Sequence, residues 1–197
     1  MVNLILASTS ARRRALLQQL QLSFSVQAVD VDESPIANES ADEMVLRLAA
    51  LKSHQALNES DGQDGLWLAA DTTVVVAGEV FAKPLDEPDG LRMLRALSGR
   101  VHEVITGVSL LKSVSTKIEH IQFAVITKVK FRNLADAEIL AYWQTGEPQD
   151  KAGAYAIQGR GAIFVESIAG SYSNVVGLPL METAENLAHL GLKLWND

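Results

Sequence analysis

The sequence predicts an α/β fold in which helices pack against a mixed sheet, and three observations support this class. Short, continuous apolar runs at residues 2–7 and 65–70 are typical of buried strands. Amphipathic segments with helix-capping residues alternate with such runs along the chain. A hairpin around residues 77–78 and an alternating apolar segment at residues 121–131 add antiparallel strands. This mixture indicates an α/β fold, with α+β as the alternative.

The N-terminal strand leads into the stretch STSARRR, in which Ser10 is suited to cap a helix over residues 11–21. Arg12, Arg13 and Arg14 then occupy the first turn, where the positive end of the helix dipole disfavours cations by up to about 1 kcal/mol. A bound polyphosphate would remove this conflict, because helix N–H groups, serine hydroxyls and guanidinium groups all bind phosphate oxygens. The alternative is that the arginines point outward and pair with surface acids.

A second strand at residues 24–29 and an acidic loop at residues 30–35 precede a long helix. Ser40 and Glu43 form a capping box at the start of this helix. Five apolar residues are predicted to lie on one side of it: Met44, Val45, Leu48, Leu51 and Ala56. Lys52 projects within the same apolar arc, so its side chain either snorkels to the edge of the core or points into a cleft.

The strand at residues 65–70 is predicted to end at Asp71, and residues 73–76 and 79–81 are predicted to form a hairpin after it. Because sheet proteins bind ligands beyond the carboxyl ends of their strands, Asp71 is a candidate to hold a divalent cation or to deprotonate a water molecule. The alternative is a structural turn residue that caps the hairpin through its side chain.

The remaining elements follow from the same signals. They are a helix that is capped by Asp86 and ends at Gly99, strands at residues 104–111 and 121–131, a helix at residues 136–145, a loop with a short strand at residues 151–164, and a final helix at residues 180–190. A chain of this length is expected to bury roughly 70% of the surface of its unfolded form. We therefore expect a single domain over residues 1–197, with room for two lobes.

The composition excludes several classes of function. The sequence has no cysteine, which rules out disulfides and thiolate metal sites and is compatible with a reducing compartment. A formal charge of −7 disfavours contact with nucleic acid. No apolar run reaches the roughly 18 residues of a membrane helix, and the N-terminus lacks the pattern of a signal peptide. We therefore expect a cytoplasmic protein that binds a small molecule and has no membrane or nucleic-acid partner.

Cations and carboxylates are the residue types left to carry chemistry. Lys52 and Lys83 are candidates to extend the arginine site, although a lysine of this kind is more often an edge residue. Glu33 is a candidate to bind the same cation as Asp71, although acidic loops are usually just solvated. The sequence has no GxxxxGK[ST], no GxGxxG after the first strand and no GxSxG. This constellation suits metal-assisted phosphoryl chemistry.

Six stretches in register resemble the Maf family over nearly the whole chain. They are ASTSARRR at 7–14, the acidic loop with Glu33, Lys52, AADTTV at 70–75, AKP at 82–84 and KAGAYAIQG at 151–159. The resemblance implies an elongated α/β fold with a central cleft, similar to the inosine triphosphatases, and a tendency to form homodimers. It also implies a nucleoside triphosphate pyrophosphatase that cuts between the α and β phosphates with Mg²⁺ or Mn²⁺. Ala11 departs from the proline that is common in the family, but alanine also favours a helix start.

The resemblance also implies roles by motif position. For catalysis the residues are Asp71 as the general base, Lys52 and Lys83. For the metal they are Glu33 and Asp71. For the substrate they are Ser8, Arg12, Arg13, Thr72 and Gln158, of which Arg12, Thr72 and Gln158 match positions associated with substrate choice.

The ADT and IQG forms resemble the branch that acts on dTTP and UTP, as opposed to the branch that acts on 7-methyl-GTP. An amide such as that of Gln158 can accept from N3–H of uracil or thymine and donate to a carbonyl. Guanine would leave buried groups unpaired, at about 1–3 kcal/mol each. The expected function is hydrolysis of dTTP and UTP, with modified pyrimidine nucleotides as further candidates. The alternative is a nucleotide-binding regulator of cell division that acts through a protein partner.

Overall fold

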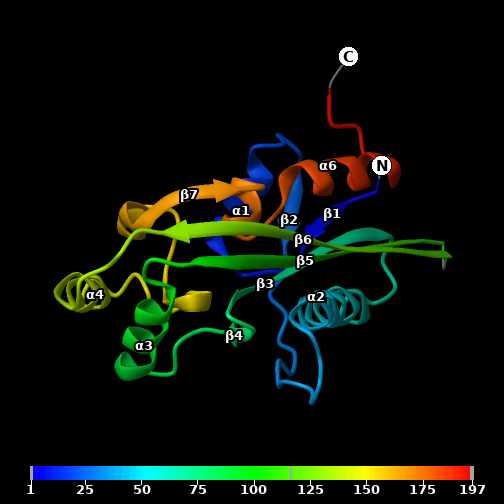
Figure 1. Ribbon diagram of the computed structural model, residues 1–197. Helices are drawn as coiled ribbons and strands as arrows, with labels where there is room; N and C mark the ends of the chain where they lie inside the picture. The colour runs from blue at the N-terminus through cyan, green and yellow to red at the C-terminus, as the bar shows by residue number, and fades with distance from the viewer. Residues whose placement is uncertain (1, 116, 196–197) are drawn as a thin grey trace. The chain divides into compact units, whose positions relative to one another are not determined.

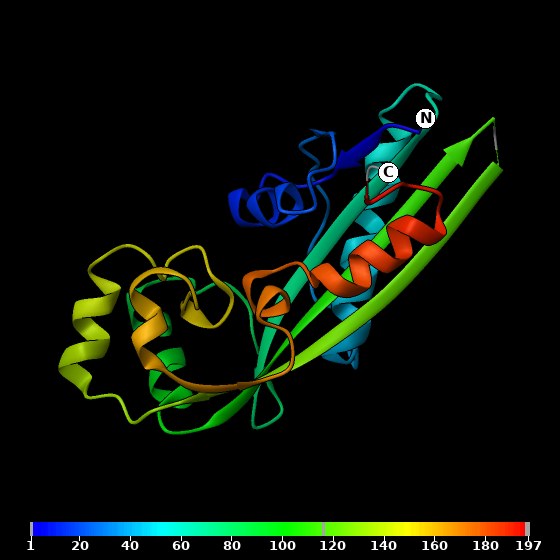
Figure 2. The same ribbon diagram turned by 90° about the horizontal axis from the view of Figure 1, so that it is seen from above.

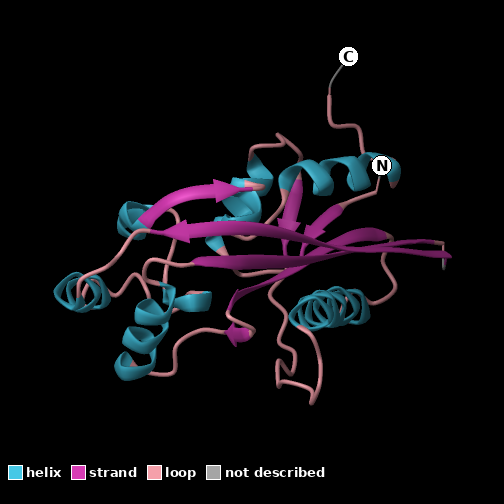
Figure 3. Cartoon of the chain, viewed as in Figure 1, coloured by secondary structure: helices cyan, strands magenta, loops and turns pink. Residues whose placement is uncertain are grey.

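The computed structural model describes residues 2–115 and 117–195 and confirms the α/β class (Figure 1). Its seven strands form one mixed sheet in the order β2-β1-β3-β5-β6-β7, with β4 paired to β3. The strands are β1 (Leu4–Leu6), β2 (Phe24–Val26), β3 (Gly65–Val76), β4 (Glu79–Phe81), β5 (Val101–Val114), β6 (Lys117–Phe131) and β7 (Val165–Ala169). The long strands β5 and β6 are neighbours in this sheet (Figure 3).

Six α-helices accompany the sheet in the part of the chain that the structure describes. They are α1 (Ala11–Gln18), α2 (Ala41–Asn58), α3 (Glu87–Leu97), α4 (Asp136–Trp143), α5 (Tyr172–Val176) and α6 (Leu180–His189). Two short 3₁₀ helices, η1 (Ala152–Ala154) and η2 (Gly159–Phe164), precede β7. None of the helices in the described ranges is both long enough and apolar enough to span a membrane.

The chain divides into two compact units. Unit 1 consists of Met1–Asp71, Thr106–Val125 and Gly177–Asp197, and unit 2 consists of Thr72–Ile105 and Ile126–Val176. The boundary falls between Asp71 and Thr72, in the middle of β3. The predicted site residues are therefore divided, with Thr72, Lys83 and Gln158 in unit 2 and the others in unit 1.

Unit 1 contains three parallel strand segments, from β1, β2 and β3, together with parts of β5 and β6. Leu4 of β1 pairs with Phe24 of β2 on one side and with Leu66 of β3 on the other. Helix α2 covers one face of the sheet in this unit and α6 covers the opposite face (Figures 1 and 2). Parallel strands covered on both faces are expected to be apolar throughout, and residues 65–70 of β3 are all buried.

The capping box at the start of α2 is confirmed, because the backbone N–H of Ser40 donates to the Glu43 carboxylate over 2.9 Å. The apolar face is partly different from the predicted one. Val45, Leu48 and Ala56 are buried as expected. Leu51 is 41% exposed, so its assignment to that face was wrong.

Helix α2 lies very close to β5 because residue 107 has no side chain. A Cβ atom at Gly107 would lie 2.5 Å from the carbonyl carbon of Val45 and 2.7 Å from the backbone nitrogen of Leu46. Neither atom can move without the whole helix. The close approach fixes the depth at which α2 packs on the sheet.

We expect Gly107→Ala to lower the free energy of unfolding by about 3 kcal/mol, at the upper end of overpacking effects, because backbone atoms must shift. Urea denaturation measures the change. The matched control is Gly62→Ala, at a turn with φ +76° and nothing within 4 Å, where only backbone strain of about 1 kcal/mol is expected. Equal losses in the two variants would contradict the close packing of α2.

Strand β3 does not end at Asp71 as predicted. It continues to Val76, where it turns at Ala77 and Gly78 into β4 with Val76 paired to Glu79. Asp71 follows the segment that pairs with β1 and precedes the segment that pairs with β4. Its carboxylate therefore projects from a continuous strand.

Unit 2 packs α3 and α4 together and encloses an aromatic core. Asp86 caps α3 as predicted, since its carboxylate accepts the N–H of Asp89 over 2.9 Å. His102 lies in the core, 2.8 Å from the hydroxyl of Tyr155 and edge-on to Phe131. Burial lowers the pKa of His102 to about 4, so the folded protein holds this ring neutral.

The buried ring makes stability depend on pH. Because the folded-state pKa of His102 lies below the unfolded value of about 6.5, its contribution is complete above that pH and is lost as the pH falls toward 4. The loss at pH 5 is expected to be about 2 kcal/mol relative to His102→Gln, which does not titrate. Chemical denaturation from pH 7.5 to 4.5 measures the difference, and parallel stability curves for the two proteins would contradict it.

Several other boundaries differ from the predicted ones. Helix α1 ends at Gln18, three residues early, and Gln21 has φ +54°. The glycine-containing stretch at residues 151–164 forms the two 3₁₀ helices, and the strand expected within it follows afterwards as β7. Helix α5 was not predicted, since five residues are too few for a periodic signal.

Candidate active site

Lys52 is the centre of the candidate site in unit 1. Its Nζ atom lies 2.6 Å from Oδ1 of Asp71 and 2.6 Å from Oε1 of Glu33. The side chains of Lys52 and Asp71 are only 13% and 15% exposed, whereas Glu33 is 52% exposed. Three segments far apart in sequence therefore contribute one cation and two carboxylates to a single cluster.

Helix α2 is held where Lys52 can reach this cluster. The neighbouring residue, Ser53, is completely buried and lies 2.7 Å from the hydroxyl of Ser109 on β5. The hydroxyl of Ser53 donates to the carbonyl of Ala50 over 2.9 Å. These bonds fix the rotation of α2 and place Lys52 toward Asp71.

The acidic loop that carries Glu33 is held against α2 by Arg47. The guanidinium group donates to both carboxylate oxygens of Glu39, over 2.6 and 2.7 Å, and to the carbonyl of Ser34. These bonds lower the pKa of Glu39 below its ordinary value. Arg47 was not predicted from the sequence, because a helical arginine eight residues after a glutamate gives no local signal.

Arg13 lies in the first turn of α1, where the sequence predicts either a bound polyphosphate or outward-pointing arginines. Ser10 caps the helix, with its hydroxyl accepting the N–H of Arg13 over 3.3 Å. The Arg13 side chain turns inward and donates from Nε to the carbonyl of Gly177 over 2.8 Å. Burial lowers the pKa of Arg13, and the charge of Asp71 acts in the opposite direction. Carboxylates of the folded protein thus compensate part of the unfavourable placement.

Charges from Arg12 and Glu33 also act on Arg13, the first lowering and the second raising its pKa. Arg14 is exposed. Ser8 lies in the connection from β1 to α1, where its hydroxyl accepts the N–H of Ser10 over 3.2 Å. The β1–α1 connection therefore adds cations and hydroxyls to the part of unit 1 that contains the carboxylates.

In unit 2 two of the recognised sequence motifs are joined. The N–H of Gly153 donates to the carbonyl of Ala82 over 3.1 Å, which ties the KAGAYAIQG stretch to the residue before Lys83. The side chains of Lys83 and Gln158 are exposed, and that of Thr72 is half-buried. Their roles in catalysis and substrate choice stay predictions.

The described residues, 2–115 and 117–195, contain no group of three or more histidine or acidic side chains placed to hold a metal ion. Glu33 and Asp71 nevertheless fit a magnesium-type cation. Both lie 2.6 Å from the same Nζ atom, so their oxygens are separated by at most twice that distance. Mg²⁺ characteristically takes one or two carboxylates and completes its shell with water and substrate phosphates. The residues that would hold the ion are these two.

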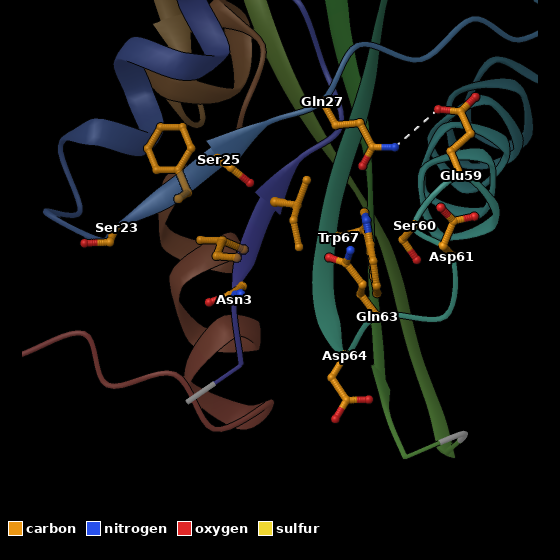
Figure 4. A pocket seen from close by; sticks show the side chains of 13 residues that line it. Asn3, Ser23, Ser25, Gln27, Glu59, Ser60, Asp61, Gln63, Asp64 and Trp67 are labelled. Atoms are coloured by element: carbon orange, nitrogen blue, oxygen red, sulfur yellow. Dashed lines mark hydrogen bonds between the residues drawn. The ribbon is translucent and has the colours of Figure 1, made fainter.

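A cavity of about 520 Å³ also lies in unit 1, and it is not the predicted site (Figure 4). Its wall is formed by Asn3 and the first two residues of β1, by residues around Ser25 on β2, and by residues between Glu59 and Trp67. The described lining residues include three carboxylates and no lysine or arginine. A polyphosphate would be repelled there, so this cavity is unsuited to a nucleoside triphosphate.

Comparison with known protein families shows to which family this chain belongs. A family model described as Maf-like protein matches residues 3–190. The chain belongs to the Maf family. The match includes every residue of the Lys52 cluster and confirms the resemblance that the six sequence stretches suggested.

Relatives of this Maf protein cover nearly its full length. A dTTP/UTP pyrophosphatase of Hahella chejuensis is 46% identical over 98% of this chain and 95% of its own. Proteins of the same description from Methylococcus capsulatus and Anaeromyxobacter dehalogenans are 49% and 50% identical over 97% of this chain, and 92% and 95% of their own. A solved structure described as a nucleoside-triphosphatase, or dITP/XTP pyrophosphatase, of Mycobacterium abscessus aligns over 96% of this chain and 95% of its own, with 13% identity and a TM-score of 0.43.

Proposed function

We propose that the protein is a nucleoside triphosphate pyrophosphatase that hydrolyses dTTP and UTP to the monophosphate and pyrophosphate. The observation that carries the proposal is the Lys52 cluster, in which a lysine bridges Asp71 and Glu33 at 2.6 Å each. It occurs in a chain of the Maf family whose relatives described as dTTP/UTP pyrophosphatases are 46–50% identical.

In the proposed reaction a water oxygen attacks the α phosphorus while Asp71 accepts its proton. The bond between the α phosphorus and the bridging oxygen breaks, and pyrophosphate leaves with the electron pair. Two N–H groups of Lys52 are directed to the carboxylates, and the third can donate to a phosphate oxygen. Arg13, which stays protonated, supplies a second positive charge. Such groups stabilise charge that develops in the transition state.

A divalent cation is part of the proposal. We expect Mg²⁺ or Mn²⁺ to bind at Glu33 and Asp71 together with the substrate, where it would neutralise further phosphate charge. The proposed substrate is a free nucleotide in the cytoplasm, because a formal charge of −7 disfavours contact with the phosphate backbone of a nucleic acid. Association of two copies stays a prediction.

Base selection is assigned to Gln158. Its amide can accept from N3–H and donate to a carbonyl of uracil or thymine, which favours UTP and dTTP over GTP. The exposed side chain of Gln158 is compatible with a ligand contact. Modified pyrimidine triphosphates that keep the same edge are candidates for the same reason.

The experiment is a substrate panel. UTP, dTTP, CTP, GTP, 5-methyl-UTP and pseudouridine triphosphate are incubated with the protein and Mg²⁺ or Mn²⁺, and the products are separated by chromatography. We expect metal-dependent release of monophosphate and pyrophosphate, fastest from UTP and dTTP. A parallel preparation of the Asp71→Asn variant controls for contaminating enzymes. Saturable binding of nucleotide without turnover would overturn the proposal and favour the regulator.

A further inference from the structure

The loop that carries Gln158 is closed by a hydrogen-bonded clasp in unit 2. The N–H of Ala156 donates to the hydroxyl of Tyr142 over 3.1 Å, and this hydroxyl donates to Oε1 of Glu147 over 2.8 Å. On the other side of Gln158, the N–H of Arg160 donates to Oε2 of Glu147 over 3.0 Å. The stretch 156–160 is therefore tied at both ends to the carboxylate of Glu147, at Ala156 through Tyr142 and at Arg160 directly. We call Tyr142 and Glu147 the clasp.

The clasp has a third backbone bond, from the N–H of Gly161 to Oε1 of Glu147 over 3.0 Å. Burial raises the pKa of Glu147, but the bonds from Gly161, Arg160 and Tyr142 outweigh it and hold the pKa below its ordinary value. The carboxylate therefore stays charged at neutral pH. Hydrogen bonds to a charged acceptor are roughly twice as strong as those between neutral groups.

The backbone of the loop packs directly against the side chains of Glu147 and Tyr142. A Cβ atom at Gly159, where φ is +79°, would lie 2.5 Å from Oε2 of Glu147. A Cβ atom at Gly161 would lie 2.6 Å from the hydroxyl of Tyr142. The backbone on the C-terminal side of Gln158 can approach so closely only because these residues are glycines.

We propose that Tyr142 and Glu147 are positioning residues for base selection, because they fix the backbone from which Gln158 presents its amide. The inference rests on the proposed function and on the assignment of base recognition to Gln158. A base edge is read through directional hydrogen bonds, so a loop that moves by a fraction of an ångström discriminates less well. The proposed phosphate-binding residues Arg13 and Lys52 belong to unit 1, whereas the clasp belongs to unit 2.

Two isosteric variants test the proposal. Tyr142→Phe removes the hydroxyl, and Glu147→Gln leaves the N–H of Arg160 or of Gly161 facing an amide donor. We expect each variant to lower the ratio of kcat/KM for UTP to that for CTP by about tenfold, with kcat for UTP changed less than threefold. Circular dichroism and thermal melting verify folding, and either folded variant is sufficient for the test.

The control is Glu138→Gln, another carboxylate of unit 2 that accepts a backbone N–H, from Ala135 over 3.1 Å, but does not touch the loop. This variant is expected to keep the wild-type ratio. A double variant separates positioning from general destabilisation. If Glu147 acts through Gln158, then Glu147→Gln combined with Gln158→Ala selects no worse than Gln158→Ala alone.

The outcomes distinguish the two proposals. Wild-type protein without any triphosphate hydrolysis would refute the proposed function. A wild type that prefers UTP, together with folded clasp variants that keep this preference within twofold, would overturn the role of the clasp alone. Independent, multiplying losses of selectivity in the double variant would overturn it as well.

Discussion

Replacing Asp71 with asparagine is expected to lower kcat for UTP by about 10²- to 10⁴-fold, the range for loss of a general base. The amide has almost the same shape as the carboxylate and can still accept a hydrogen bond from Lys52, which lies 2.6 Å from Oδ1. The variant therefore keeps the packing around β3 but cannot take the proton of the attacking water. Steady-state kinetics with saturating UTP and Mg²⁺ measure the loss.

Two controls accompany Asp71→Asn. Asp61→Asn changes an exposed carboxylate that lines the separate cavity of unit 1, and Arg14→Ala removes an exposed cation from α1. Both are expected to change kcat less than twofold. Turnover of Asp71→Asn within threefold of the wild type would show that this carboxylate is not the base.

Replacing Lys52 with methionine is expected to lower kcat/KM for UTP by about 10²-fold or more, the effect of removing one stabilising charge from a transition state. Methionine keeps an unbranched apolar stem of similar length, so the fold is expected to be retained. Without the ammonium group, Glu33 and Asp71 face each other with no lysine between them and repel the triphosphate. Activity measurements over a range of Mg²⁺ concentrations record the defect.

The matched control for Lys52→Met is Lys112→Met, another lysine of unit 1. Lys112 pairs with Glu119 over 3.2 Å and is 20% exposed, but it does not touch the candidate site. Its replacement is expected to leave kcat/KM within twofold. Lys52→Arg restores the charge with a planar geometry, so an intermediate rate is expected. If Lys52→Met retained normal kcat/KM, the bridge between the carboxylates would be structural only.

The sequence predicts the helix starts well because capping is local. Ser10, Ser40 and Asp86 each lie next to the N–H groups or the glutamate with which they interact. The hairpin of residues 73–76 and 79–81 is confirmed. The predicted strand end at Asp71 was wrong, because a polar residue inside a strand resembles a strand end. The prediction that Leu51 is buried was also wrong, because helical periodicity does not show where the neighbouring strands stop.

For the candidate site, too, the sequence predicts the local features but not the contacts between distant segments. The residue types at Arg13, Lys52 and Asp71 indicate phosphate chemistry, and these residues do lie in one unit. That Lys52 binds both carboxylates at once depends on how α2 is set against β5, which no local pattern records. Arg47 was missed because its partner Glu39 lies eight residues away, and Glu147 because its partners Arg160 and Gly161 lie 13 and 14 residues away.

Isotope transfer from water tests the central claim most directly, namely that the Lys52 cluster directs water to the α phosphorus. UTP is hydrolysed in water enriched in ¹⁸O, and the products are analysed by mass spectrometry. Attack at the α phosphorus predicts one labelled oxygen in UMP and none in pyrophosphate. Label in the pyrophosphate, or release of UDP and inorganic phosphate, would contradict the account.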